Sequence, residues 1–244
     1  MTTVASRAIA GLPGRLAVLA ILAIPPACTV ADSAGESGQA QAATQEPAPE
    51  EPARQDRLFP PQDLGLLETP DRALWQKPHE IMDALRIAEG STVADIGAGA
   101  GWFTIQLAQR VGPNGLVYAQ DVQPQMLRSI ERRVGRETLS DRVRPLLGSG
   151  SDPNLPAAAL DAVLVVDTYQ EVEDRVLFLQ NLARSLKPGG LIGIVNYRPG
   201  EGGPGPPADE RVASAAVEAD ARAAGLRLVD RETLPYQYLL VLGP

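Results

Sequence analysis

The sequence has little of the chemistry that indicates a disulfide-stabilised or metal-binding protein. It contains one cysteine, Cys28, and one histidine, His79. A single cysteine cannot form an internal disulfide bond or a cysteine-rich metal cluster. One cysteine and one histidine are also too few side chains for a zinc site made of these two residue types. We therefore expect no metal site. We expect His79 to be a surface or capping residue, because it follows Pro78 at the start of a predicted helix.

The chain also lacks a block of positive charge. Its formal net charge is −8, spread along the sequence. Because negative charge repels phosphate backbones, we expect a small-molecule substrate and no nucleic acid partner. No internal repeat is visible, and 44% hydrophobic residues are enough to bury a core, most simply in one domain. The sequence does not indicate an oligomeric state.

The amino-terminal residues indicate an export signal. Arg7 and Arg15 precede an apolar run from Leu16 to Ile24, which is too short to span a bilayer but suits the core of a signal peptide. A small residue before Cys28 resembles a lipobox, although Pro25 stands where leucine is usual. We expect an exported chain, periplasmic or tethered to a membrane through Cys28. Ordinary cleavage, an uncleaved anchor and a cytoplasmic chain with an unused signal are the alternatives.

These features divide the chain into three segments. Residues 1–28 are the expected signal peptide with its lipobox-like end, residues 29–57 a linker, and residues 58–244 the folded domain. The linker consists mainly of Ala, Gln, Glu, Ser, Gly and Pro, with almost no large apolar side chain to bury. We therefore expect it to be a disordered tether.

Within residues 58–244 the apolar pattern alternates between strands and helices. A helix is expected after Pro78, with Leu74 and Ile81 among its apolar positions. Two late apolar runs with no helix between them predict an antiparallel hairpin at one sheet edge. The expected strands are 92–96, 116–119, 143–147, 160–166, 191–195, 226–229 and 236–242, and the expected helices 103–111, 124–134, 176–186 and 208–224. The fold class is thus α/β: a doubly wound, mostly parallel sheet with helices on both faces and an antiparallel edge hairpin.

A glycine-rich turn follows the first predicted strand. It contains Asp95, Gly97, Gly99 and Gly101 and leads from strand to helix, where α/β sheets bind nucleotide-like ligands. A dinucleotide fingerprint would need Gly or Ala at position 102 or 104, but these positions hold Trp and Thr. An acid at the strand end is unfavourable beside a diphosphate, whereas it attracts the cationic amino group of a methionine moiety. The turn therefore favours S-adenosylmethionine.

Other polar residues follow the next two strands. Asp121 ends the second strand, where its carboxylate can accept hydrogen bonds from both ribose hydroxyls. Dinucleotide sites use the same device, so Asp121 does not discriminate between the two ligands. Ser149 and Asp152 follow the third strand and can lie around an adenine edge.

Five segments in order resemble the class I S-adenosylmethionine-dependent methyltransferases. They are VADIGAGAGWFT (93–104), YAQDVQPQML (118–127), GSGSDPNLP (148–156), DAVLVVDTYQE (161–171) and LKPGG (186–190). More narrowly, LWQKP (74–78) and NYRPG (196–200) are similar to a group of bacterial methyltransferase-domain proteins. The resemblance implies a Rossmann-like, seven-stranded sheet whose last strand is antiparallel, and S-adenosyl-L-methionine as cofactor.

The resemblance also implies a set of cofactor-binding residues. Asp121 is expected on the ribose, and Ser149 and Asp152 near the adenine. Ser149 stands where the family often has an acid, and Gln170 and Glu171 stand where the narrower group tends to have histidines. The full set is Asp95, Gly97, Gly99, Gly101, Asp121, Val122, Ser149, Asp152 and Asp167.

Methyl transfer is an in-line displacement, so the protein mainly aligns the acceptor with the methyl group and excludes water. Asp167, Thr168, Tyr169 and Glu171 follow the fourth strand and are the candidates to face the acceptor. Of these we expect Asp167 and Tyr169 to be catalytic, with Asp167 accepting a proton or orienting a nucleophile. The alternative is that Asp167 caps the following helix and Tyr169 packs in the core.

The leading functional hypothesis is an S-adenosylmethionine-dependent methyltransferase that acts on an unidentified, small-molecule acceptor. Because S-adenosylmethionine is made in the cytoplasm, export favours an alternative: an exported S-adenosylmethionine-binding or catalytically degenerate structural lipoprotein. A nicotinamide oxidoreductase would require the third fingerprint glycine that the chain lacks.

Overall fold

The computed structural model describes residues 58, 60, 69–200 and 202–244. The predicted signal peptide (1–28) and linker (29–57) lie outside the described residues. None of the helices in the described part combines the length and apolar character that crossing a bilayer requires.

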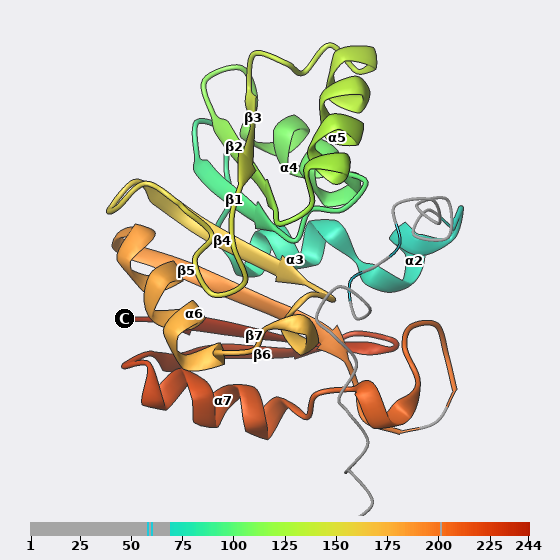
Figure 1. Ribbon diagram of the computed structural model, residues 1–244, viewed down its shortest axis with the longest axis vertical. Helices are drawn as coiled ribbons and strands as arrows, with labels where there is room; N and C mark the ends of the chain where they lie inside the picture. Colours follow the sequence, from blue (N-terminus) through green and yellow to red (C-terminus); the bar gives the residue numbers. More distant parts are fainter. Residues whose placement is uncertain (1–57, 59, 61–68, 201) are drawn as a thin grey trace, which may run out of the picture. The chain divides into compact units, whose positions relative to one another are not determined.

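Seven strands form one sheet in the order β3-β2-β1-β4-β5-β7-β6 (Figure 1). Strands β1 to β5 pair in parallel, and β7 runs antiparallel between β5 and the edge strand β6. This confirms the predicted mostly parallel sheet with an antiparallel hairpin at one edge. The strands are β1 (Thr92–Ile96), β2 (Leu116–Asp121), β3 (Val143–Leu147), β4 (Leu160–Val166), β5 (Leu186–Tyr197), β6 (Arg227–Thr233) and β7 (Gln237–Gly243).

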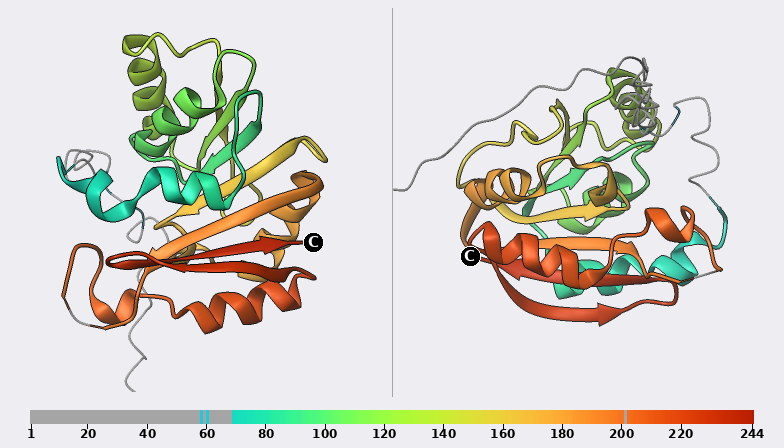
Figure 2. Two further views of the ribbon diagram at one scale, coloured as in Figure 1. Left: turned by 180° about the vertical axis from the view of Figure 1, so that it is seen from behind. Right: turned by 60° about the horizontal axis from the view of Figure 1, so that its bottom comes forward.

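Helices cover both faces of the sheet, as Figures 1 and 2 show. One apolar cluster joins the sheet to α3 (Pro78–Ala84), α4 (Trp102–Val111) and α5 (Pro124–Arg136). A second joins the other face to α6 (Arg175–Ser185) and α7 (Ser214–Ala223). The central strand β4 is buried on both sides, which explains its continuous apolar run. The strand order reverses between β1 and β4, and such a switch point is where open α/β sheets bind ligands.

Two helix predictions need correction. The helix expected after Pro78 is α3, which begins at that residue, but a second helix, α2 (Arg72–Gln76), precedes it. Lys77 separates the two in a left-handed conformation (φ 58°). Leu74 was wrongly expected at an apolar position, since it lies on α2 with 76% of its surface exposed. The helix expected over 208–224 is shorter: a 3₁₀ turn occupies Ala208–Glu210, and α7 begins only at Ser214.

Candidate cofactor and acceptor site

The turn after β1 needs its glycines for conformational and steric reasons. Gly97, Gly99 and Gly101 have backbone φ values of 66°, 53° and 80°, in a region that residues other than glycine rarely adopt. At Gly97 an added Cβ would lie 2.2 Å from Oγ1 of Thr168, at the end of β4. Gly97 therefore lets the turn pass close to the segment that follows β4 before α4 begins.

Two carboxylates flank this turn. Oδ2 of Asp95 accepts a hydrogen bond from the hydroxyl of Thr104 at 2.7 Å, and burial raises the pKa of Asp95 to about 6. The carboxylate of Asp121 accepts hydrogen bonds from the backbone N–H groups of Gly99 and Gln123, both at 2.9 Å. Burial raises the pKa of Asp121 as well. Thr104, which breaks the dinucleotide fingerprint, thus serves to orient Asp95.

A cation from α2 lies close to these acids. The guanidinium of Arg72 is 4.4 Å from the centroid of the Trp102 ring, at the start of α4. Its positive charge partly opposes the rise that burial causes in the pKa of Asp95 and of Asp167. Helix α2 therefore brings one positive charge to the carboxyl ends of β1 and β4.

Asp167 is held between two buried glutamines. The side-chain amide of Gln237 donates to Oδ1 of Asp167 at 2.7 Å, and that of Gln76 donates to Oδ2 at 3.3 Å and to Oε1 of Gln237 at 3.0 Å. Both glutamines are completely buried. Burial raises the pKa of Asp167 to about 7. Asp167 does not cap α6, because Asp174 does so by accepting the N–H of Leu177.

Tyr169 packs in the core formed with α6 and α7. Its side chain is completely buried, its hydroxyl donates to Oδ2 of Asp220 at 2.8 Å, and its ring packs edge-on against Phe178. This geometry is the packing alternative considered for Tyr169.

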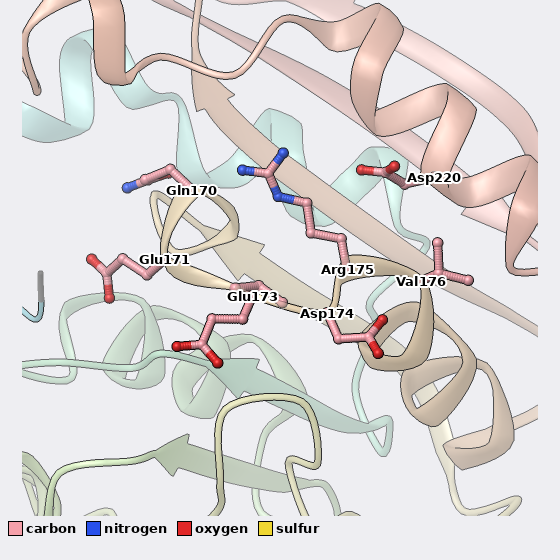
Figure 3. Close-up of a pocket in the computed structure, with 8 residues that line it drawn as sticks. Gln170, Glu171, Glu173, Asp174, Arg175, Val176 and Asp220 are labelled. Carbon is pink, nitrogen blue, oxygen red and sulfur yellow. The ribbon is translucent and has the colours of Figure 1, made fainter. Parts of the chain in front are cut away.

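Glu171 lies on the same short segment, in the 3₁₀ turn Tyr169–Glu171. It is half-buried and lines an open cavity of about 720 Å³. Figure 3 shows Gln170 and Glu171 extending to the same side of the turn, away from Val176 and Asp220. Burial, and then the negative charges of Asp121 and Asp167, raise the pKa of Glu171 to about 7. Glu171 therefore shares the electrostatic environment of the cofactor-site acids.

Ser149 and Asp152, the two residues expected near the adenine, differ in their hydrogen bonds. Ser149 is exposed, and its N–H donates to the carbonyl of Asp152 at 2.8 Å. Oδ1 of Asp152 accepts the N–H of Asn154 at 2.9 Å, and Asp152 lines a cavity of about 230 Å³ together with residues of α6. Val122 is half-buried, and its N–H helps to stabilise the ionised form of Asp121.

The sequence pattern did not point to Arg72, Gln76 or Gln237 as site residues. Gln76 and Gln237 each stand beside large apolar side chains, and a completely buried amide in such a place needs polar partners. The apolar neighbours of these two glutamines could therefore have suggested that each is buried and hydrogen-bonded, but they do not indicate that Asp167 is the partner. His79 is exposed as expected, and within the described residues no group of His, Cys, Asp and Glu side chains could hold a metal ion.

The charges of the site fit a cationic ligand. The carboxyl groups of Asp95, Asp167 and Glu171 all have raised pKa values because burial leaves their negative charge poorly compensated. A ligand with sulfonium and ammonium charges would supply that compensation, whereas a diphosphate would add to the repulsion. The residues present therefore fit S-adenosylmethionine better than a dinucleotide.

Fold and site together define a doubly wound α/β domain suited to a cationic nucleoside. Residues 93–190 match the methyltransferase domain family. An S-adenosylmethionine-dependent methyltransferase from Aquifex aeolicus has a crystal structure that superimposes with a TM-score of 0.71, at 28% identity, over 75% of this chain and 98% of that one. The described domain belongs to the class I S-adenosylmethionine-dependent methyltransferases, and S-adenosylmethionine is the cofactor of this family.

Two relatives with named activities match only part of this chain. The demethylmenaquinone methyltransferase of Listeria monocytogenes is 29% identical over 126 residues, which is 50% of each chain. The nocamycin O-methyltransferase of Saccharothrix syringae is 30% identical over 119 residues, covering 49% of this chain and 42% of that one. The chain thus spans about half the length of these relatives.

Proposed function

We propose that this protein transfers a methyl group from S-adenosylmethionine to a small-molecule acceptor. The observation that carries the proposal is the pair of buried carboxylates, Asp95 and Asp121, on either side of a glycine turn whose three glycines all have positive φ. The net charge of −8 agrees with an acceptor other than nucleic acid.

The residues of the chain would bind and orient both reactants. The oxygens of Asp121 that accept the N–H groups of Gly99 and Gln123 keep further lone pairs for two ribose hydroxyls. Asp95, held by Thr104, would face the ammonium group, and Arg72 the carboxylate of the methionine part. When bound, S-adenosylmethionine supplies a methyl carbon on a cationic sulfur. The protein then contributes alignment and exclusion of water.

The remaining proposed contacts follow from position. Val122 lies next to Asp121 in the segment that leads to α5, and Asp167 directly follows β4, the strand beside β1. Near the adenine we propose a contact through Ser149 or backbone groups of its turn. We place Asp152 second there, because its carboxylate already accepts the N–H of Asn154.

The names of the two relatives support a small-molecule acceptor. One is named for demethylmenaquinone and the other for O-methylation of nocamycin. We propose that the acceptor of this chain is also a small molecule, and we assign neither of these two compounds to it.

Methyl transfer can be tested with radiolabelled S-adenosylmethionine and a cell-envelope extract, with mass spectrometry of the labelled product. The wild-type chain should label a small molecule, and Asp121→Ala should reduce labelling at low cofactor concentration. Cofactor binding without any labelled product would favour the alternative, a binding or structural protein that has lost turnover. Absence of binding at millimolar S-adenosylmethionine would overturn the proposal altogether.

A further inference from the structure

The segment after β4 carries three groups that could take a proton from an acceptor: Asp167, Tyr169 and Glu171. Asp167 has both carboxylate oxygens engaged by the amides of Gln76 and Gln237. A carboxylate in that position is already committed to fixing the helix α2 and the start of β7. It serves better as an anchor than as a proton acceptor.

Tyr169 is unsuited for a different reason. Its side chain is completely buried, and its hydroxyl already donates to Asp220. Burial, the hydrogen bond and the negative charge of Asp220 all raise the pKa of Tyr169 well above its ordinary value. The phenolate that a base would require is therefore inaccessible at neutral pH.

Glu171 has neither restriction. Within the part of the chain that the structure describes, its carboxylate forms no hydrogen bond or ion pair. The side chain is half-buried and lines the open cavity of about 720 Å³, so a small molecule can reach it. It also lies close enough to Asp121 and Asp167 for their charges to raise its pKa. Glu171 thus lines an opening to solvent and lies within electrostatic reach of Asp121 and Asp167.

The ionisation of Glu171 suits a base. Its pKa of about 7 means that a useful fraction is ionised at neutral pH and that the ionised form binds a proton more strongly than an ordinary glutamate does. The same cavity is lined by Gln170, Glu173 and Arg175, so its wall is polar. An acceptor with polar groups near its reacting atom would fit this wall better than a purely apolar one.

We propose that Glu171 is the general base of the reaction and that the acceptor is a phenol, enol or quinol, whose hydroxyl proton must leave during transfer. This inference rests on the proposed methyltransferase function. The hydroxyl proton passes to a carboxylate oxygen of Glu171 while the acceptor atom forms a bond to the methyl carbon. The carbon–sulfur bond breaks, and its electron pair stays on sulfur. The proton then leaves Glu171 through the open cavity to solvent.

Because the acceptor is unidentified, the test uses defined probes with labelled S-adenosylmethionine. Catechol and 1,4-naphthoquinol carry the proposed hydroxyl, and aniline is a matched ring without one. The full-length wild-type chain should methylate at least one hydroxyl probe and not aniline. Methylation of aniline alone, or of no probe by a chain that binds the cofactor, would overturn the proposed acceptor class. A chain that neither binds cofactor nor transfers methyl would instead disprove the methyltransferase function.

The role of Glu171 is tested with Glu171→Gln, Glu171→Asp and the exposed α5 residue change Glu131→Gln as a charge-matched control. Loss of a general base should lower kcat by about 10²- to 10⁴-fold in Glu171→Gln, with partial activity in Glu171→Asp and wild-type activity in the control. In the wild type, kcat/KM should rise with pH up to about 7, and this rise should be absent in Glu171→Gln.

Two further readouts do not depend on turnover. Calorimetry in buffers of different ionisation enthalpy should show that cofactor binding at pH 7 releases fewer protons from Glu171→Gln than from the wild type. Thermal unfolding checks that the variants are folded. An unchanged kcat or an unchanged pH profile in Glu171→Gln would each overturn the role as base.

Discussion

The side-chain amide of Gln237 donates a hydrogen bond of 2.7 Å to Oδ1 of Asp167, although 70 residues separate the two along the chain. Gln76 donates to the other oxygen of the same carboxylate and to Gln237 itself. One carboxylate thus ties together the end of β4, the start of β7 and the helix α2. The same helix carries Arg72, so this contact fixes where the cation of the site lies.

Replacing Gln76 with leucine should destabilise the protein by about 1–3 kcal/mol, because Asp167 loses a buried hydrogen-bond donor. The loss should also raise the pKa of Asp167, since that amide favours the ionised form. Urea denaturation measures the change. Gln109→Leu, at an exposed position of α4, is the control and should change stability by less than about 0.5 kcal/mol. Equal effects at both positions would contradict the proposed anchoring role.

The cofactor-free protein should become less stable as pH rises from about 4 to above 7. Asp95, Asp167 and Glu171 have folded-state pKa values of about 6, 7 and 7, above the values of 3.8 to 4.5 expected when unfolded. A raised folded pKa contributes stability below the unfolded pKa, and this contribution is lost as pH passes through the folded pKa. Denaturation midpoints at pH 5 and pH 8 measure the trend.

Binding of the cationic S-adenosylmethionine should offset this loss of stability at high pH. S-adenosylmethionine is expected to bind more tightly at pH 8 than at pH 5, because the ionised acids attract it more strongly. Calorimetric titration across this range gives the slope. Affinity that is independent of pH would show that these carboxyls do not face the cofactor.

Asp121→Ala should weaken binding of S-adenosylmethionine by about 1–3 kcal/mol through the loss of charged hydrogen bonds to ribose. The exposed residue change Asp141→Ala removes the same charge from the loop before β3 and should leave affinity unchanged. Calorimetry on both variants makes the comparison. Asp121 would have to be removed from the site if the two affinities were the same.

Gly97→Ala tests the close approach of the turn to β4. Alanine at φ 66° costs roughly 1–2 kcal/mol in strain, and the collision with Thr168 adds about 1–3 kcal/mol. Gly90→Ala is a matched control with φ of +82° and nothing within 4 Å of the added Cβ, so it should show the strain alone. Adding Thr168→Ala should recover part of the difference. Chemical denaturation of the three variants and the wild type would show whether the collision is real.

Cys28 lies outside the described residues, and its processing remains a prediction from the sequence. We expect the chain from a membrane fraction to begin at Cys28 and to carry a diacylglycerol on its thiol. Cys28→Ser should release the protein from that fraction. Intact-mass spectrometry decides the question, since a chain that keeps Met1 and a free thiol would contradict both cleavage before Cys28 and lipidation.

Several predictions could be made from local pattern because they depend on neighbouring residues. The apolar runs placed β1, β3 and β4 at the residues where the structure has them. The glycine turn was recognised because three glycines in five residues require unusual backbone conformations. The separate helix α2 was missed, since Leu74 matches the apolar spacing of the helix that begins at Pro78.

The order of strands and helices, the glycine turn and the acids beside it follow from the amino-acid sequence, because each depends on residues a few positions apart. The partners of Asp167, the burial of Tyr169 and the accessibility of Glu171 were decided only when β4, β7 and α2 came together. Hydrogen bonding and burial depend on which distant segments share a surface. Folding therefore determines which of several similar side chains is anchored and which remains open to a ligand.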